Sequence, residues 1–255
     1  MKKGQRRWTE EELILTINLY FKTTFGRLYR KNPDVIQLAE LINRTPSAVA
    51  YKLVNFASFD PSLEARGIKG ASNASKLDKK VWNDFYQNID AAAYNSELLR
   101  AKIENKSIQE FIGFNEEQNF VGEEKTIRVK RRIKQSFFRK MILASYNETC
   151  CITGISKKEL LIAGHIKPWS SDKNNRLNPQ NGIAINSLHD KAFETGLITI
   201  DTNFQVLICS KFLKSKDESI KNFFNKYHRK KIILPSKFLP DKKFLEYHND
   251  ERFLK

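Results

Sequence analysis

Two histidines and an asparagine are the residues of this chain whose types and spacing best suit chemistry. His165 and His189 lie on either side of Asn181, which comes 16 residues after the first and 8 before the second. A neutral imidazole, with a free pKa of about 6.5, can accept a proton or bind a cation near neutral pH. Taken singly, His165 could equally be a core histidine and His189 a capping residue at a helix start. The three together predict a site.

The segments around these residues are expected to form two strands followed by a helix. An apolar run over 160–166 ends near His165, a polar loop covers 170–180, and a second apolar run over 182–185 leads to a helix that opens near His189. A side chain on a regular element is held more rigidly than one on a loop. We therefore expect His165 to be firmly aimed, and His189 to face the strands from the first turn of the helix.

Three motifs contain these residues. They read Gly164-His165-Ile166-Lys167-Pro168-Trp169, Arg176-x-Asn178-Pro179-x-Asn181-Gly182-Ile183 and His189-Asp190-x-Ala192-Phe193-x-x-Gly196-Leu197-Ile198. Their order resembles the HNH, or ββα-metal, nuclease family, in the branch found in bacterial restriction-type enzymes. Other stretches look like the C-terminal end of that branch and the helical domain commonly fused to it: Phe244-Leu245-Glu246-Tyr247-His248, Trp8-Thr9 and Arg44-Thr45-Pro46-Ser47-Ala48-Val49.

The resemblance implies hydrolysis of a phosphodiester bond and gives each residue a role. His165 is the expected general base that deprotonates water. His189 is the expected ligand of a divalent metal ion, Mg²⁺ or Mn²⁺, which neutralises charge on the phosphate and on the leaving 3′ oxygen. Asn181 is expected to fix the backbone of the preceding loop and so to hold His165 in orientation.

One residue departs from the pattern of the family. The residue before the base is often an Asp or a His that also binds the metal, and here it is Gly164. The second metal ligand is therefore open, with Asp190 and Glu194 as nearby candidates. Waters and substrate oxygens could complete the shell of a Mg²⁺ ion, which keeps several waters when bound.

The charge of the chain predicts a polyanionic partner. Against 29 Asp and Glu the chain has 45 Lys and Arg, which gives a formal net charge of +16 and an isoelectric point of about 9.7. Such a surface attracts phosphates in a salt-dependent manner. Together with the resemblance, this charge predicts double-stranded DNA as the partner. No apolar run approaches the roughly 20 residues that span a bilayer, so no membrane partner is expected.

The densest cationic segment is 125–140, with eight basic residues and no acidic one. It also carries an apolar stripe, so part of its charge could be the solvated face of an amphipathic helix. Nearer the N-terminus, two helices around Thr45-Pro46-Ser47 look like a helix-turn-helix unit that offers its second helix to DNA, with an ordinary helical hairpin as the alternative. The residues expected to contact DNA are Arg44, Lys52, Arg128, Arg131, Arg132, Arg139 and Arg176.

The cysteines point to a reducing compartment. Cys150, Cys151 and Cys209 are too few, and too unevenly spaced, for a symmetrical disulfide framework. The basic N-terminal residues are not followed by an apolar stretch like that of a signal peptide. The sequence therefore predicts a cytoplasmic protein.

The predicted fold class is α+β. It consists of a mostly helical, helix-turn-helix-like domain at 1–106 for DNA recognition, a linker at 107–124 where the sequence becomes polar and acidic, and a ββα-metal HNH nuclease domain at 125–255.

The resemblance predicts a metal-dependent DNA endonuclease of restriction type. Its cleavage could also depend on modified bases in the DNA. A homodimer is expected, because a single site of this kind cuts one strand. An alternative from another class is a non-catalytic helix-turn-helix regulator with a vestigial nuclease domain, which Gly164 favours. A nuclease directed at RNA is a third.

Overall fold

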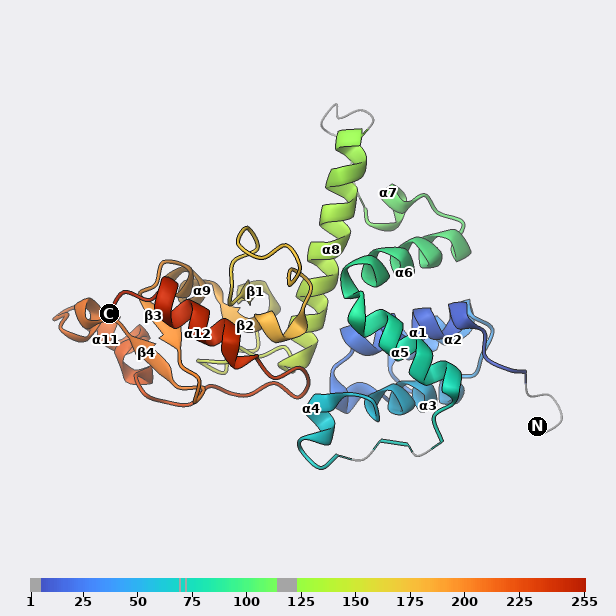
Figure 1. The fold of residues 1–255 in the computed structure, drawn as a ribbon, viewed down its shortest axis with the longest axis horizontal. Coiled ribbons are helices and arrows are strands. Elements are labelled where there is room, and N and C mark those ends of the chain that lie inside the picture. The colour runs from blue at the N-terminus through green and yellow to red at the C-terminus, as the bar shows by residue number, and fades with distance from the viewer. Residues whose placement is uncertain (1–5, 69, 72, 114–122) are drawn as a thin grey trace. The chain divides into compact units, whose positions relative to one another are not determined.

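The computed structural model describes residues 6–68, 70–71, 73–113 and 123–255, and its architecture is α+β (Figure 1). The chain divides into two compact units, a helical unit at Met1–Lys140 and a C-terminal unit at Met141–Lys255. The division differs from the predicted one, because it falls inside α8 (Glu123–Ser145). Of the predicted linker at 107–124, residues 114–122 lie outside the described residues.

The helical unit is built from short helices. Before α8, its described elements are α1 (Glu10–Lys22), η1 (Phe25–Arg27), α2 (Pro33–Leu41), α3 (Pro46–Ala57), α4 (Pro61–Glu64), α5 (Lys76–Gln87), α6 (Ile89–Ile103) and α7 (Ile108–Phe111).

Local signals in the sequence decide where these helices begin. Thr9 Oγ1 accepts a hydrogen bond from the Glu12 backbone N–H at 3.2 Å, and the Glu12 carboxylate accepts one from the Thr9 N–H at 3.0 Å. This reciprocal pair is a capping box. Thr45 caps α3 through Oγ1 alone, which accepts a hydrogen bond from the Ala48 N–H at 3.2 Å, and Pro46 is at the first helical position. Both caps depend on neighbouring residues alone.

Aromatic rings fill the core of the helical unit. Phe21 of α1 stacks on Trp82 and Phe85 of α5, with centroid distances of 5.8 and 5.1 Å. Phe137 of α8 lies 6.3 Å from Phe21 and is buried. Such ring pairs add about 0.5–1.5 kcal/mol beyond their buried area. The apolar stripe of α8 is thus part of this core, which is why the basic segment 125–140 belongs to the helical unit.

The C-terminal unit combines short strands and helices. Its described elements after α8 are η2 (Lys158–Leu160), β1 (Leu161–His165), η3 (Pro179–Asn181), β2 (Gly182–Asn186), α9 (Ser187–Glu194), β3 (Ile198–Ile200), β4 (Val206–Ile208), α10 (Ser210–Leu213), α11 (Glu218–Phe223), η4 (Asn225–Tyr227) and α12 (Lys242–Glu251).

Two antiparallel strand pairs and the helix between them form the centre of this unit. In the β1–β2 pair, His165 lies opposite Gly182, and α9 follows β2 directly. Asn186 caps α9, since its Oδ1 accepts a hydrogen bond from the His189 N–H at 3.0 Å. The β3–β4 pair forms an antiparallel hairpin. The order of strand, loop, strand and helix agrees with the sequence analysis.

Helix α12 is attached to the turn that follows α9. Gly196 has a φ of +74°, and a Cβ at this position would lie 2.0 Å from the carbonyl oxygen of Arg252, so this close approach requires glycine. The Leu254 N–H donates to the Gly196 carbonyl at 2.9 Å. The ring of His248 stacks on Phe193 of α9 with a centroid distance of 3.7 Å. These contacts bring α12 beside the β1–α9 region.

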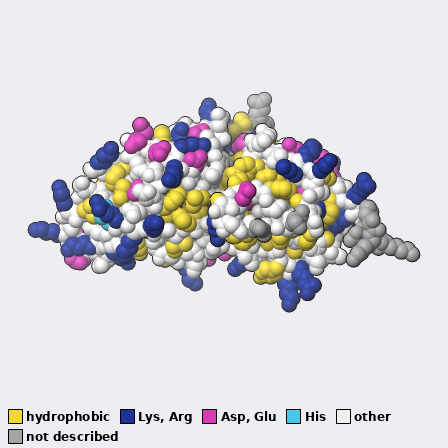
Figure 2. All heavy atoms as spheres, turned by 60° about the horizontal axis from the view of Figure 1, so that its bottom comes forward, with side chains coloured by type: hydrophobic (Ala, Val, Ile, Leu, Met, Phe, Trp, Pro, Cys, Tyr) yellow, Lys and Arg dark blue, Asp and Glu magenta, His cyan; other side chains and the backbone are white. Residues whose placement is uncertain are grey.

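Positive charge is spread over the surface of the protein. On the face shown in Figure 2, Lys and Arg side chains occur in many places rather than in a single patch. Among the described residues, no helix combines the length and the apolar character needed to cross a bilayer.

Candidate active site

His165 ends β1 and lies at a cavity of about 260 Å³ in the C-terminal unit. Its Nε2 is 2.9 Å from the carbonyl oxygen of Arg176. A carbonyl only accepts hydrogen bonds, so in the neutral ring Nε2 carries the hydrogen and Nδ1 is the nitrogen that can accept a proton. Burial lowers the pKa of His165 below its ordinary value, although the Arg176 carbonyl opposes this. The imidazole is therefore neutral and of fixed tautomer near pH 7.

Asn181 fixes the loop between the two strands. Its side chain is 1% exposed, and its Oδ1 accepts a hydrogen bond from the Lys167 N–H at 2.8 Å. Its Nδ2 donates to the carbonyl oxygens of Lys167 and Asn175 at 3.1 and 3.3 Å. A buried amide with three backbone partners holds both ends of the loop. Because Lys167 is two residues after His165, these bonds also limit where the imidazole can lie.

His189 lies in a different environment from His165. Its ring is buried, with Nδ1 within 3.0–3.1 Å of the Asn186 side chain, and it packs against Phe224 and Tyr227 at centroid distances of 5.1 and 5.5 Å. Burial lowers its pKa. It does not line the cavity at His165. Within the described part of the chain, the buried Nε2 of His189 has no hydrogen-bond partner, as suits a nitrogen that binds a metal. The role of His189 as metal ligand stays a prediction.

The residue after His189 faces the cavity instead. Asp190 and Glu194 are one helical turn apart on α9, and both line the cavity with Gly164 and His165. A Cβ at position 164 would lie 2.7 Å from Asp190 Oδ1. The carboxylate of Asp190 thus occupies the space that a side chain before the base would fill. Burial, and then the charge of Glu194, raise the pKa of Asp190.

These two carboxylates fit a divalent cation of the Mg²⁺ or Mn²⁺ type. Such ions prefer oxygen ligands, and Mg²⁺ retains several waters, so two protein carboxylates suffice. Asp190 is half-buried and receives no hydrogen bond from the described part of the chain in the contacts observed. A cation would relieve the repulsion between the two charges. Among the residues that the structure describes, no cluster of three or more His, Cys, Asp or Glu side chains could hold a metal ion. The three cysteines are buried and form no disulfide bond.

Sequence reasoning did not place two residues of α12 at this cavity, although His248 belongs to a motif that resembles the family. His248 and Arg252, both near the end of α12, line the cavity. Arg252 donates a hydrogen bond to the Glu194 carbonyl at 2.8 Å, so its positive charge lies at the edge of the cavity. Nothing in the local sequence indicates this position, because it results from the contact of α12 with Gly196 and Phe193.

The lowered pKa of His248 predicts that the free energy of unfolding depends on pH. Burial is the main cause that lowers its pKa to about 4, against an unfolded value of about 6.5. A lowered histidine pKa gives stability that is complete above pH 6.5 and is lost as the pH falls toward 4. At pH 5 the loss from this group is about 2 kcal/mol. Urea unfolding between pH 7.5 and 5 should show this slope, and H248Q should show a shallower one; equal slopes would contradict the assignment.

The predicted DNA contacts divide into three groups. Arg128, Arg131, Arg132 and Arg139 are exposed on α8. Arg176 is half-buried, its Nε donates to the Trp169 carbonyl at 3.0 Å, and its guanidinium lies 5.0 Å from the Trp169 ring centroid. Arg44 and Lys52 form the third group, and their charges are held inside the helical unit.

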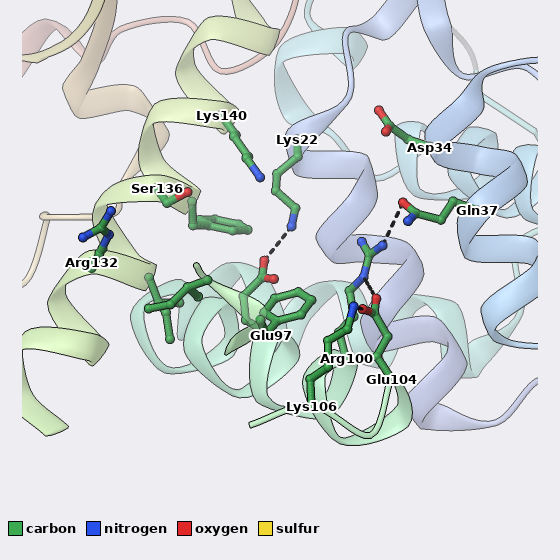
Figure 3. Close-up of a pocket in the computed structure, with 14 residues that line it drawn as sticks. Lys22, Asp34, Gln37, Glu97, Arg100, Glu104, Lys106, Arg132, Ser136 and Lys140 are labelled. Carbon is green, nitrogen blue, oxygen red and sulfur yellow. Dashed lines mark hydrogen bonds and ion pairs between the residues drawn. The ribbon is translucent and has the colours of Figure 1, made fainter. Parts of the chain in front are cut away.

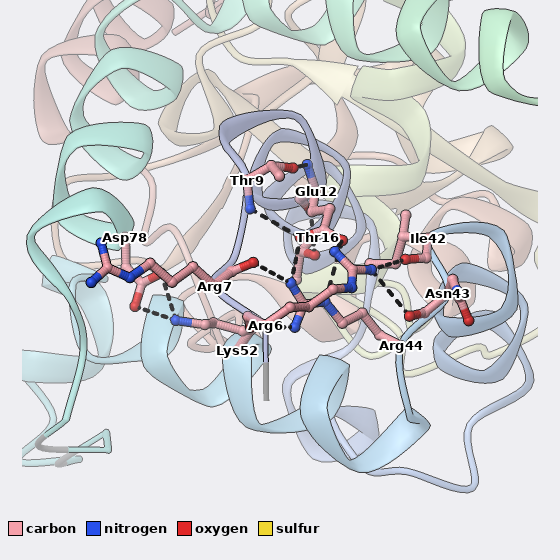
Figure 4. A network of polar contacts seen from close by, with 10 residues as sticks. All are labelled: Arg6, Arg7, Thr9, Glu12, Thr16, Ile42, Asn43, Arg44, Lys52 and Asp78. Atoms are coloured by element: carbon pink, nitrogen blue, oxygen red, sulfur yellow. Dashed lines mark hydrogen bonds and ion pairs between the residues drawn. The ribbon is translucent and has the colours of Figure 1, made fainter. Parts of the chain in front are cut away.

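Arg44 is the centre of a polar network in the helical unit (Figure 4). Its guanidinium binds both oxygens of Glu12 at 2.8 and 3.2 Å and donates to the carbonyl oxygens of Arg6 and Arg7. Its side chain is only 10% exposed. Burial opposes ionisation of Glu12, but the hydrogen bonds from Arg44, Thr9 and Arg6 outweigh it and lower the Glu12 pKa.

Lys52 is enclosed in the same way. Its Nζ is 2.7 Å from Oδ2 of Asp78, whose side chain is fully buried. Both charges are thus paired with carboxylates of the same unit, and contact of Arg44 and Lys52 with DNA stays a prediction. The exposed part of α3 consists of uncharged residues such as Ser47 and Tyr51. The one basic residue of α3, Lys52, is paired with Asp78, so the exposed face of α3 carries no positive charge for DNA phosphates.

The variant R44A tests whether Arg44 contacts DNA or stabilises the helical unit. Removal of the guanidinium leaves the buried Glu12 with fewer partners, and we expect a destabilisation of about 3 kcal/mol in urea unfolding. The control K80A removes an exposed salt bridge to Glu10 and should leave the stability nearly unchanged. DNA affinity of folded R44A, from fluorescence anisotropy, should remain within about twofold. Unchanged stability with weakened binding would place Arg44 on the DNA surface.

A comparison with known families matches the segment that contains His165, Asn181 and Asp190. A family model described as HNH endonuclease matches residues 150–201, which contain β1, β2, α9 and β3. No curated protein matches the chain. The match covers well under half of the chain, and it supports an HNH nuclease domain at this segment.

Proposed function

We propose that this protein is a metal-dependent endonuclease that hydrolyses phosphodiester bonds of double-stranded DNA. The observation that carries the proposal is the cavity of the C-terminal unit, where His165, neutral and of fixed tautomer, shares its walls with Asp190 and Glu194. The match of residues 150–201 to an HNH endonuclease family supports the same activity. The exposed arginines of α8 supply cations for the phosphates of the duplex.

The chain's residues provide the steps of an in-line hydrolysis. His165 Nδ1 accepts a proton from a water, whose oxygen bonds to phosphorus as the bond to the 3′ oxygen breaks. The 3′ oxygen takes a proton from solvent, which leaves 3′-hydroxyl and 5′-phosphate ends, and His165 returns its proton to solvent. A divalent cation held by Asp190 and Glu194 would neutralise charge on the phosphate and the leaving oxygen. Asn181 and the Arg176 carbonyl keep the imidazole in place.

The position of Asp190 bears on the alternative of a vestigial nuclease domain. That alternative depended on Gly164, which leaves the position before the base without a donor. Since the Asp190 carboxylate lies against Gly164, an oxygen donor is still available at this position. We therefore propose an active enzyme rather than a non-catalytic regulator.

The proposal is tested by plasmid cleavage. We expect the purified chain to convert supercoiled plasmid to nicked or linear DNA in Mg²⁺ or Mn²⁺, and EDTA to abolish the conversion because the carboxylates then lack their cation. Agarose gels measure the outcome. No cleavage with either metal, or cleavage that persists in EDTA, would contradict the proposal.

The same gels address the finer parts of the proposal. We propose a restriction-type role in which cleavage depends on the modification state of the DNA, so methylated and unmethylated plasmids should be cut at different rates. Linear product without a nicked intermediate indicates a homodimer that cuts both strands, whereas nicked product that accumulates indicates one site at a time. Digestion of an RNA substrate at the same rate would favour the RNA-directed alternative.

A further inference from the structure

A second cavity, of about 500 Å³, lies entirely within the helical unit. Its walls come from α1, α2, α6, α7 and α8 and from the segment after α6 (Figure 3). Sites for small molecules have volumes of roughly 300–1,000 Å³. The cavity contains none of the residues proposed for catalysis, so it needs a separate explanation.

Basic side chains outnumber acidic ones in the walls of this cavity. The basic residues are Lys22, Arg100, Lys106, Arg132 and Lys140. The acidic residues are Asp34, Glu97 and Glu104. Two of these carboxylates are already engaged, since Glu97 pairs with Lys22 at 2.5 Å and Glu104 pairs with both Arg100 and Lys106 at 2.9 Å. The cavity thus keeps a positive excess.

Part of the excess lies at Lys140, next to the ion pair of Lys22 with Glu97. The side chain of Lys22 is 11% exposed, and Figure 3 shows that its amino group and that of Lys140 turn toward the same part of the cavity. Burial lowers the pKa of Lys22; Glu97 opposes this, but Lys140 and Arg100 lower it further. Within the described part of the chain, Lys140 has no carboxylate within salt-bridge distance in the ion pairs observed. An additional anion here would relieve repulsion among the cations.

Aromatic rings stand beside these cations. The Arg100 guanidinium lies 6.0 Å from the Phe111 ring centroid, and Lys22 Nζ lies 5.9 Å from that of Phe137. A simple inorganic anion needs no aromatic wall, whereas a planar base stacks on such rings. Gln37 and Asp34 add polar groups at the side of α2, which can hydrogen-bond the edge of a base.

We propose that this cavity binds a nucleotide, with Lys22 and Lys140 at its phosphate and Phe111 against its base. The nucleotide could be free in solution or could be part of a DNA strand, and the chemistry of recognition is the same. The inference does not depend on the proposed nuclease activity, because the cavity lies in the other unit of the chain.

Calorimetric titration of the full-length chain tests the proposal. The probes are a panel of deoxyribonucleoside and ribonucleoside 5′-monophosphates, the matching nucleosides, and pyrophosphate. At least one monophosphate should bind at least about tenfold more tightly than its nucleoside and than pyrophosphate. K140Q should weaken binding about tenfold, because a hydrogen bond to a charged group is lost. K102Q, which removes an exposed lysine of α6 outside the cavity, should leave it unchanged.

Two results would overturn the proposal. One is the absence of binding by any monophosphate at about 1 mM, or equally tight binding of pyrophosphate. The other is equal affinity of K140Q, K102Q and the unmodified chain. Because no cleavage is measured, a failure here is distinct from a failure of the nuclease proposal.

A labelled single-stranded oligonucleotide separates the two sources of the nucleotide. It is bound to a full-length H165A chain, so that strand cleavage does not interfere. If the monophosphate displaces the strand and K140Q weakens strand binding more than K102Q does, the cavity takes a nucleotide of DNA. If the K140Q substitution does not change the affinity for the strand while the monophosphate still binds to the unmodified chain, the ligand is a free nucleotide. The two measurements thus show whether the nucleotide is free or part of DNA.

Discussion

H165A should slow cleavage of supercoiled plasmid by about a thousandfold, within the range of general-base contributions. The Arg176 carbonyl fixes the hydrogen on Nε2, so Nδ1 is the basic nitrogen, and alanine removes it without adding bulk. Initial rates of nicking in Mg²⁺ measure the effect. Affinity for DNA should change little, because the imidazole acts on the proton of a water and not on the phosphate backbone.

The matched control for this prediction is H228A. It removes an imidazole from the same unit, one whose Nδ1 accepts a hydrogen bond from the Ile208 N–H away from the cavity. Its rate of cleavage should stay within about threefold of that of the unmodified chain. Equal rates of cleavage for H165A and H228A would show that His165 is not the general base and would contradict the proposed reaction.

D190N should lower the rate of cleavage about a hundredfold and weaken its dependence on Mg²⁺ concentration. The amide keeps the shape of the side chain but removes the charge that attracts the cation. G164A should have a similar effect for a different reason, since its Cβ would lie 2.7 Å from Asp190 Oδ1 and push the carboxylate aside. Rates measured across a Mg²⁺ titration report both effects.

Two controls belong to this pair of variants. D250N removes an exposed carboxylate of α12, and G26A adds a Cβ where no atom lies within 4 Å. Both should keep nearly full activity. If D190N cleaves DNA as fast as D250N at limiting Mg²⁺, the carboxylate does not hold the cation, and His189 would remain as a candidate.

The sequence was sufficient to predict the strands and the helix of the site and the position of His165 at the end of a strand. The order of strand, loop, strand and helix follows from alternating apolar runs and from caps such as Asn186, which are local signals. Asn181 lies between the two strands for the same reason. The position of His165 at a strand end follows directly from the apolar run that precedes it.

The sequence was not sufficient for the side chains that depend on helix phase or tertiary packing. Consecutive residues of a helix point about 100° apart, so Asp190 lines the cavity while His189 packs against Phe224 and Tyr227. The sequence named Asp190 and Glu194, one turn apart, as candidate ligands, but it did not show that both line the cavity. No spacing could have placed Arg252 at the cavity or shown that Arg44 is buried, because both depend on contacts between distant segments.

Helix α8 limits how this protein could have been assembled by recombination of genes. The helix crosses the division between the units, and its buried residues Val129, Ile133 and Phe137 belong to the core of the helical unit. An exchange of one unit for an unrelated one would place the junction inside a continuous helix. Otherwise the transferred piece would carry an uncovered apolar stripe, which promotes aggregation. Inheritance of the two units as one piece avoids both outcomes.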